Sequence, residues 1–195
     1  MSIRIIVPHR GLGVAKTRLE PVLSPDARTA LADQLLRHVL GVAVGVAETV
    51  VISPSLDLGP LVEACGSRLV VQRGMGLNAG LDQARADALA DGISLLGVLH
   101  GDLPNLTAED VEMLLAAAPT PRGVAIATDK TGSGTNGLAL RPPSALRFSF
   151  GVDSFAKHRA AAAALPFVVV DRPGLAFDLD TPADLARWLE LGDAA

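Results

Sequence analysis

The chain has 195 residues, of which 49% are hydrophobic and only 3% aromatic, and its formal net charge is −4. This length predicts one compact domain, which we place at residues 1–191, followed by a disordered tail at residues 192–195. The acidic balance, without a basic run or interleaved aromatic residues, argues against nucleic acid as the main partner. The longest apolar run, Val39 to Ala47, has nine residues, far fewer than the roughly 20 that cross a bilayer.

The amino terminus and the single cysteine indicate a cytoplasmic protein. The chain starts with an apolar strand and lacks the charged and apolar regions of a signal peptide. The lone Cys65 cannot form an intramolecular disulfide or a zinc cluster, and we expect it to be a small buried residue. The apolar helix at Val39 to Ala47 leaves room for a homodimer contact, although a parallel sheet buried on both faces explains the same apolar excess.

Short apolar runs rich in β-branched residues alternate with segments that carry helix-start signals. In chain order we expect a strand at Ile3 to Val7, a helix from Pro25 to about Ala43, a strand at Thr49 to Ser53, a helix at Pro60 to Ala64, a strand at Arg68 to Gln72, a helix at Asn78 to Ala90, a strand at Ser94 to Leu99, a helix from Ala108 to about Ala117, strands at Gly123 to Thr128 and Asn136 to Leu140, a helix at Asp153 to Ala164, a strand at Phe167 to Val170 and a helix that begins at Pro182. This alternation predicts a three-layer α/β fold with a mostly parallel sheet, whose ligands bind beyond the carboxyl ends of the strands.

The loop after the first strand, "PHRGLGVAKTRL", combines glycines with three cations, Arg10, Lys16 and Arg18. Such a loop can present N–H groups and positive charge to a polyphosphate. It is not a Walker A loop, because Arg10 and Ala15 stand where that motif needs glycine, and it also departs from the Rossmann fingerprint at Lys16. A solvated basic loop is the alternative interpretation.

Three aspartates stand where a sheet edge can bring them together. Asp102 follows an apolar strand, and Asp178 and Asp180 are two residues apart in an extended segment, so that their side chains point the same way. This arrangement suits Mg²⁺, which takes one or two carboxylates together with waters and substrate phosphates. Each aspartate alone also fits a turn former or a helix cap, but together with the cationic loop they favour a metal site.

Two further segments have ambiguous chemistry. The glycines and hydroxyls of "DKTGSGTNGLAL" form either an anion-binding nest or an ordinary hairpin turn, and the turn is the favoured interpretation. In "FGVDSFAKH", Ser154 lies in the first turn of a helix, a natural phosphate site but also a common cap. We expect His100, which has no nucleophile motif beside it, to be satisfied by backbone groups.

Taken together, the motifs resemble the 2-phospho-L-lactate guanylyltransferase family, which includes phosphoenolpyruvate guanylyltransferases and serves coenzyme F-420 biosynthesis. The resemblance covers nearly the whole chain in order, and "GSGTNGL" with "FGVDSFAKH" is its specific pair. The segments that carry it are "AKTRL…LSPDAR" (15–28), "GLNAGL" (76–81), "HGDLPNLT" (100–107), "GSGTNGL" (132–138), "FGVDSFAKH" (150–158) and "DLDTPADL" (178–185).

This resemblance implies a mixed, mostly parallel α/β sheet of the GT-A nucleotidyltransferase type, in agreement with the alternation of elements. It also implies that GMP passes from GTP to the phosphate of phosphoenolpyruvate or 2-phospho-L-lactate, and that the product goes to the next enzyme of the pathway. The implied roles are catalysis for Lys16, Arg18 and Asp102, nucleotide binding for Pro8, Arg10, Lys16, Gly76 and Asn78, binding of the acceptor phosphate for Thr135, Gly151 and Ser154, and Mg²⁺ coordination for Asp102, Asp178 and Asp180.

The chain departs from the family pattern at two positions. Arg10 replaces a lysine, which keeps the charge but changes reach and geometry, and Gly137 replaces an alanine. Two alternative functions remain open: a molybdenum-cofactor or sugar-phosphate nucleotidyltransferase, and a nucleotide-binding module that has lost catalysis.

Overall fold

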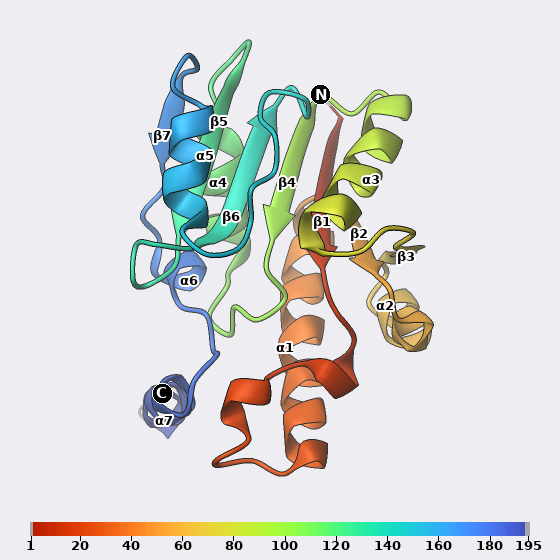
Figure 1. Ribbon diagram of the computed structural model, residues 1–195, viewed down its shortest axis with the longest axis vertical. Helices are drawn as coiled ribbons and strands as arrows, with labels where there is room; N and C mark the ends of the chain where they lie inside the picture. The colour runs from red at the N-terminus through yellow and green to blue at the C-terminus, as the bar shows by residue number, and fades with distance from the viewer. Residues whose placement is uncertain (1, 194–195) are drawn as a thin grey trace.

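A seven-stranded sheet forms the middle layer of the computed structural model, which describes residues 2–193. Its order is β3-β2-β1-β4-β6-β5-β7 (Figure 1). Strand β6 is antiparallel to both of its neighbours, and every other pair is parallel. The strands are β1 (Ile3–Pro8), β2 (Glu48–Ser53), β3 (Arg68–Val71), β4 (Leu95–Leu99), β5 (Gly123–Thr128), β6 (Thr135–Arg141) and β7 (Phe167–Val169).

Helices cover both faces of this sheet, which confirms the predicted three-layer α/β fold. Neighbouring strand residues point to opposite faces, so Ile5 packs in one core cluster and Ile6 in the other. The first cluster includes α1 (Pro25–Val46), α2 (Gly59–Ala64), α4 (Ala108–Ala116) and α6 (Pro173–Ala176), and the second includes α3 (Leu77–Ala90) and α5 (Ser154–Ala161). Three short 3₁₀ helices are Leu12–Val14, Thr17–Leu19 and Leu56–Leu58.

The last helix, α7 (Pro182–Asp193), joins the body through a third, smaller cluster. Leu19 from the loop after β1 and Leu179 from the chain before α7 are fully buried there against α1. This packing fixes both segments at the carboxyl end of the sheet. It therefore holds the cationic loop close to the aspartates that precede α7.

The predicted helix starts are confirmed by their hydrogen bonds. The Ser24 side chain accepts from the backbone N–H of Ala27 at the start of α1. Thr107 and Asp110 form a complete capping box at the start of α4. Such caps satisfy N–H groups that a helix leaves without intrahelical partners.

Several expected boundaries differ from the structure. Helix α5 ends at Ala161 rather than Ala164, because the chain tightens after it: the N–H groups of Ala163 and Leu165 donate to carbonyls three residues back rather than four. Helix α6 was not expected, since four residues are too short to show a period. Helix α7 continues two residues past Leu191, because one glycine in the last turn costs only about 1 kcal/mol; the remainder of the expected tail, 194–195, lies outside the described residues.

The apolar run in α1 belongs to the core. Val39, Leu40 and Ala43 are fully buried against the sheet, whereas Gly41 and Gly45 in the same run are exposed. Cys65 is half-buried rather than buried. Within residues 2–193, no helix is long and apolar enough to cross a membrane.

Candidate active site

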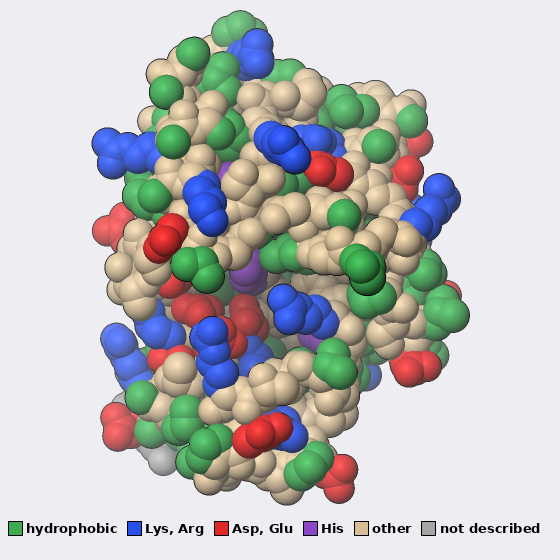
Figure 2. Space-filling model, viewed as in Figure 1, with side chains coloured by type: hydrophobic (Ala, Val, Ile, Leu, Met, Phe, Trp, Pro, Cys, Tyr) green, Lys and Arg blue, Asp and Glu red, His purple; other side chains and the backbone are tan. Residues whose placement is uncertain are grey.

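A cavity of about 790 Å³ opens at the carboxyl ends of β1 to β4. Strand β1 has β2 on one side and β4 on the other, and ligands of open α/β sheets bind at such a switch point. Figure 2 shows the hollow, with acidic and histidine side chains inside it and basic side chains around it. Of the residues expected at the site, those that line the cavity are Pro8, Arg10, Lys16, Arg18, Gly76, Asp102 and Asp180.

Lys16 lies at the centre of the cavity's polar contacts. Its backbone adopts a left-handed conformation, with φ of 57°, which is uncommon outside glycine and often accompanies function. The side chain is only 6% exposed, and its Nζ lies 2.7 Å from Asp102 Oδ2 and 2.9 Å from Asp180 Oδ1. Arg18 reaches Asp180 at 3.5 Å but is 74% exposed, so it sits at the rim.

These contacts set the protonation of the pair. Burial opposes ionisation of Asp102, but the Lys16 ammonium holds its pKa below the usual value. Burial likewise opposes the charge on Lys16, and Asp102 and Asp180 nevertheless raise its pKa. Both groups are therefore charged near neutral pH, which places a fixed cation beside fixed carboxylates.

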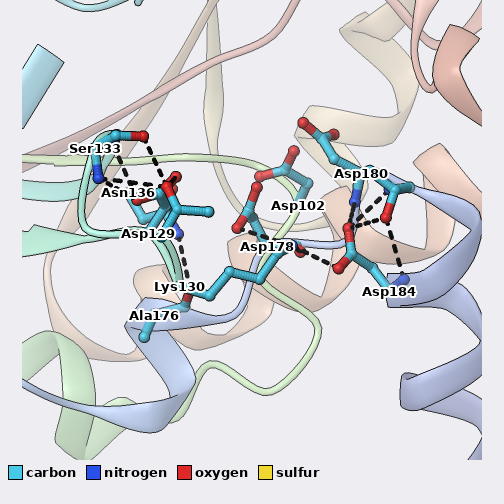
Figure 3. A network of polar contacts seen from close by, with 12 residues as sticks. Asp102, Asp129, Lys130, Ser133, Asn136, Ala176, Asp178, Asp180 and Asp184 are labelled. Carbon is cyan, nitrogen blue, oxygen red and sulfur yellow. Dashed lines mark hydrogen bonds and ion pairs between the residues drawn. The ribbon is translucent and has the colours of Figure 1, made fainter. Parts of the chain in front are cut away.

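Two carboxylate oxygens in this region are buried without a hydrogen-bond partner in the described part of the chain, Asp102 Oδ1 and Asp178 Oδ1. Figure 3 shows the Asp102 and Asp178 side chains close together, with Asp180 nearby. Burial raises the pKa of Asp178, although the neighbouring Lys130 opposes that rise. Among residues 2–193, no group of three or more histidine, cysteine or acidic side chains is already arranged to hold a metal; Lys16 occupies the space between Asp102 and Asp180.

Lys130, which sequence reasoning missed, holds the aspartate segment in place. Its Nζ donates to the Asp178 carbonyl at 2.9 Å and contacts Asp184 Oδ1 at 2.6 Å (Figure 3). Burial opposes ionisation of Asp184, but Lys130 and Thr181 lower its pKa to about 2. No sequence signal linked Lys130, at the start of the β5–β6 turn, to a segment some fifty residues later.

The glycine-rich segment between β5 and β6 is a hairpin turn, as expected. Its N–H groups do not face an open nest: Asp129 Oδ1 accepts from Ser133 N and Gly134 N, each at 2.9 Å. The turn also anchors α5, because the Phe155 N–H donates to the Ser133 carbonyl. The loop that carries Gly151 and the hairpin that carries Thr135 are thus joined.

Thr135 and Ser154 lie together, and both are buried. Thr135 Oγ1 is 3.1 Å from Ser154 Oγ and 3.2 Å from His158 Nδ1. The Ser149 N–H donates to His158 Nε2, so a neutral ring carries its proton on Nδ1, facing Thr135. Burial lowers the pKa of His158 to about 4, which keeps the ring neutral.

Asn78 connects α3 to the loop before α5. Its amide donates to the Phe150 carbonyl at 3.0 Å and accepts from the Phe150 N–H at 2.8 Å. The side chain is therefore engaged with backbone and does not line the cavity, whereas the neighbouring Gly76 does. Gly151, next to Phe150, has φ of 123°, a conformation that favours glycine.

Two histidines of the cavity wall differ in their contacts. His9 Nδ1 accepts from the Gly11 N–H at 3.0 Å, and burial lowers its pKa to about 4. His100 Nε2 is buried without a hydrogen-bond partner among residues 2–193. The expectation that backbone groups satisfy the His100 side chain is therefore wrong at this nitrogen, because the ring lines the cavity and packs 5.6 Å from the Phe150 ring.

Comparison with known proteins gives a consistent result. A family model described as "Guanylyl transferase CofC like" matches residues 3–194. A phosphoenolpyruvate guanylyltransferase of Sphaerobacter thermophilus is 42% identical over 190 residues, covering 95% of this chain and 91% of that protein. A phosphoenolpyruvate guanylyltransferase of Rubrobacter xylanophilus is 42% identical over 194 residues, covering 96% of this chain and 93% of that protein. A nucleotidyl transferase of Methanothermobacter thermautotroptrophicus shares the fold, with a TM-score of 0.68 and 17% identity over 97% of each chain.

Proposed function

Since the chain belongs to the CofC-like guanylyl transferase family, we propose that it transfers GMP from GTP to the phosphate of a three-carbon phospho-acid and releases pyrophosphate. Phosphoenolpyruvate, which the relatives' names specify, is the first candidate acceptor, and 2-phospho-L-lactate is the second. The chain is thus a nucleotidyltransferase of coenzyme F-420 biosynthesis. The observation that carries the proposal is Lys16 paired with Asp102 and Asp180 at the sheet's switch point.

The reaction brings two anions together, so charge and position matter more than a strong base. A phosphomonoester has a second pKa of about 6, so the acceptor oxygen is already anionic at neutral pH and attacks the α-phosphorus as pyrophosphate leaves. Lys16 would neutralise the β- and γ-phosphates of GTP from the loop after β1. Arg10 and Arg18, both on that loop, extend the positive charge toward the rim of the cavity.

The nucleotide itself would lie along the carboxyl ends of β1 to β3. Pro8 and Gly76 line that part of the cavity and leave room beside backbone for the ribose and base. Asn78 contributes indirectly, because its amide fixes the loop at Phe150. We therefore propose it as a positioning residue rather than a nucleotide contact.

The carboxylates fit a magnesium ion. Two buried oxygens without a hydrogen-bond partner among residues 2–193 are Asp102 Oδ1 and Asp178 Oδ1, and the second lies 3.5 Å from Lys130 Nζ. Such carboxylate oxygens are the hard ligands that Mg²⁺ prefers, and the cation also takes waters and substrate phosphates. We propose Asp102 and Asp178 as the principal ligands, with Asp180 beside them. When bound, the ion would neutralise charge on the reacting phosphates.

The acceptor would bind next to the cavity, where β6 and the loop before α5 meet behind His100; Thr135, Gly151 and Ser154 do not themselves line the cavity. We propose that Thr135, Gly151 and Ser154 hold its phosphate, with His158 orienting the two hydroxyls through Thr135. Because GTP is made in the cytoplasm, we propose that location, and the product would pass to the next enzyme of the pathway.

The experiment is a screen of pyrophosphate release by the purified protein with Mg²⁺, each of four nucleoside triphosphates and each of a panel of acceptors. We expect turnover with GTP plus phosphoenolpyruvate or 2-phospho-L-lactate. Asp102→Asn should abolish it, and the matched control Asp87→Asn, on an exposed part of α3, should retain it.

Other outcomes of the screen would contradict the proposal. Turnover only with a sugar phosphate or molybdopterin would indicate a different nucleotidyltransferase. Tight GTP binding without turnover on any acceptor would indicate a binding module.

A further inference from the structure

His100 lines the cavity, and the proposed reaction gives its side chain no role. Its Nε2 is buried and lacks a hydrogen-bond partner within residues 2–193. The other histidines contrast with it: His9 accepts from Gly11, His38 pairs with the Leu106 carbonyl, and both ring nitrogens of His158 are engaged. Buried polar atoms almost always have partners, so an exception in a cavity wall indicates a group that meets a ligand.

The contacts of His100 place it between the cavity and the segments that we propose for the acceptor. Its backbone N–H donates to the Asn136 carbonyl, next to Thr135. Its ring lies 5.6 Å from the Phe150 ring, next to Gly151. His100 is thus held by both segments that we propose for the acceptor, whereas Arg10, Lys16 and Arg18 come from the loop after β1.

His100 is also close to the reacting centre. It lies two residues before Asp102, and both line the same cavity. The acceptor's phosphate must reach the α-phosphorus of GTP beside Asp102. In a three-carbon phospho-acid the carboxylate is only a few bonds from that phosphate, so it falls within reach of a side chain placed here.

Resting on the proposed function, we propose that His100 Nε2 donates a hydrogen bond to the carboxylate of the acceptor. A neutral imidazole has one N–H donor, and an ionised carboxylate is a strong acceptor for it. The contact selects phospho-acids over phosphate esters without a carboxylate. His100 is therefore a specificity-determining residue.

The test compares two competitive inhibitors of the acceptor, phosphoglycolate, which has a carboxylate, and ethyl phosphate, which lacks one. His100→Phe keeps a ring against Phe150 but removes the donor. We expect this variant to raise the inhibition constant of phosphoglycolate about 10- to 100-fold and to raise the KM of the acceptor by a similar factor. The inhibition constant of ethyl phosphate and the KM of GTP should stay unchanged.

Two further variants keep the result interpretable. His100→Gln places an amide N–H near the Nε2 position and should restore part of the preference for phosphoglycolate. His100→Asn, whose amide is too short to reach that position, should behave like His100→Phe and replaces it if the phenylalanine variant does not fold. His38→Phe, the same change at a histidine outside the cavity, should leave both inhibition constants unchanged.

The proposal is overturned if, in folded His100→Phe or His100→Asn, both inhibitors lose affinity equally or neither loses affinity. The failure of the proposed function is separate, because it would appear as an absence of wild-type turnover with GTP and every phospho-acid.

Discussion

Replacing Lys16 with methionine should destabilise the protein more than removing the charge of its partner. Lys16 is the only ion-pair partner of Asp102 among the described residues, whereas Asp180 also meets Arg18. Lys16→Met therefore leaves Asp102 charged, mostly buried and without a counter-ion. Removing one partner of a buried pair costs about 3–5 kcal/mol; because the Asp102 side chain is 22% exposed, we expect about 2–3 kcal/mol.

The reverse change should cost less. Asp102→Asn leaves Lys16 paired with Asp180 at 2.9 Å, so only one hydrogen bond to a charged group is weakened, and we expect about 1 kcal/mol. The double variant Lys16→Met with Asp102→Asn should recover part of the loss of the first, because no charge is then left unpaired at Asp102. Urea denaturation at pH 7 measures all three.

The stability difference between wild type and Lys16→Met should depend on pH. In the wild type the pKa of Asp102 is below its usual 3.8, so the ionised carboxyl stabilises the fold above that value and loses this contribution as the pH falls. Without Lys16, burial raises the pKa, so protonation relieves the unpaired charge. The difference between wild type and Lys16→Met should therefore shrink as the pH falls from 7 toward 4. Equal losses in the two single variants, or a difference independent of pH, would refute this reasoning.

Three other changes test separate parts of the site. Asp178→Asn should abolish pyrophosphate release without lowering the free energy of unfolding, because burial already raises the pKa of this carboxyl; a large loss of stability would contradict that. Between pH 6.5 and pH 4 the free energy of unfolding should fall by about 2–3 kcal/mol more for the wild type than for His158→Gln. The reason is that the pKa of His158 is about 4 in the folded protein but 6.5 in an unfolded chain, so only the unfolded chain takes up the proton in this range. Parallel pH profiles of the unfolding free energy from urea denaturation would contradict this. Asn78→Ala should lower kcat/KM for the acceptor roughly 10- to 100-fold, because it removes the two hydrogen bonds that fix the loop at Phe150. An unchanged kcat/KM in steady-state kinetics would show that the loop keeps its conformation without Asn78.

The elements were predictable because their signals are local. Strands such as β5, which the sequence predicts at its observed bounds, are runs of small and β-branched residues buried on both faces. The start of α4 follows from Thr107 and Asp110, which make the expected capping box. Helix α6 carries no such signal, because a single turn has no period.

The site was predictable in its members but not in its contacts. The cationic loop and Asp102 meet because both follow neighbouring parallel strands, which the alternation implies. That Lys16 turns back onto Asp102 and Asp180 depends on its left-handed backbone and on the packing of Leu19 and Leu179, which no local pattern encodes.

Long-range side-chain partners were the main omission. Lys130 holds Asp178 and Asp184 across some fifty residues, and Asn78 reaches Phe150 across 72. Sequence spacing carries no information about such pairs, because the fold alone brings them together. The same holds for His100, whose uncommitted Nε2 becomes visible only once its neighbours are placed.

The most direct test of the central claim is ³¹P NMR of a reaction containing the protein, Mg²⁺, GTP and phosphoenolpyruvate. A new diphosphate that links the guanosine α-phosphate to the acceptor's phosphate, formed in equal amount with pyrophosphate and absent with Asp102→Asn, is the predicted result. Formation of pyrophosphate with free GMP, or of GDP with inorganic phosphate, would show that the acceptor is not guanylylated and would contradict the account.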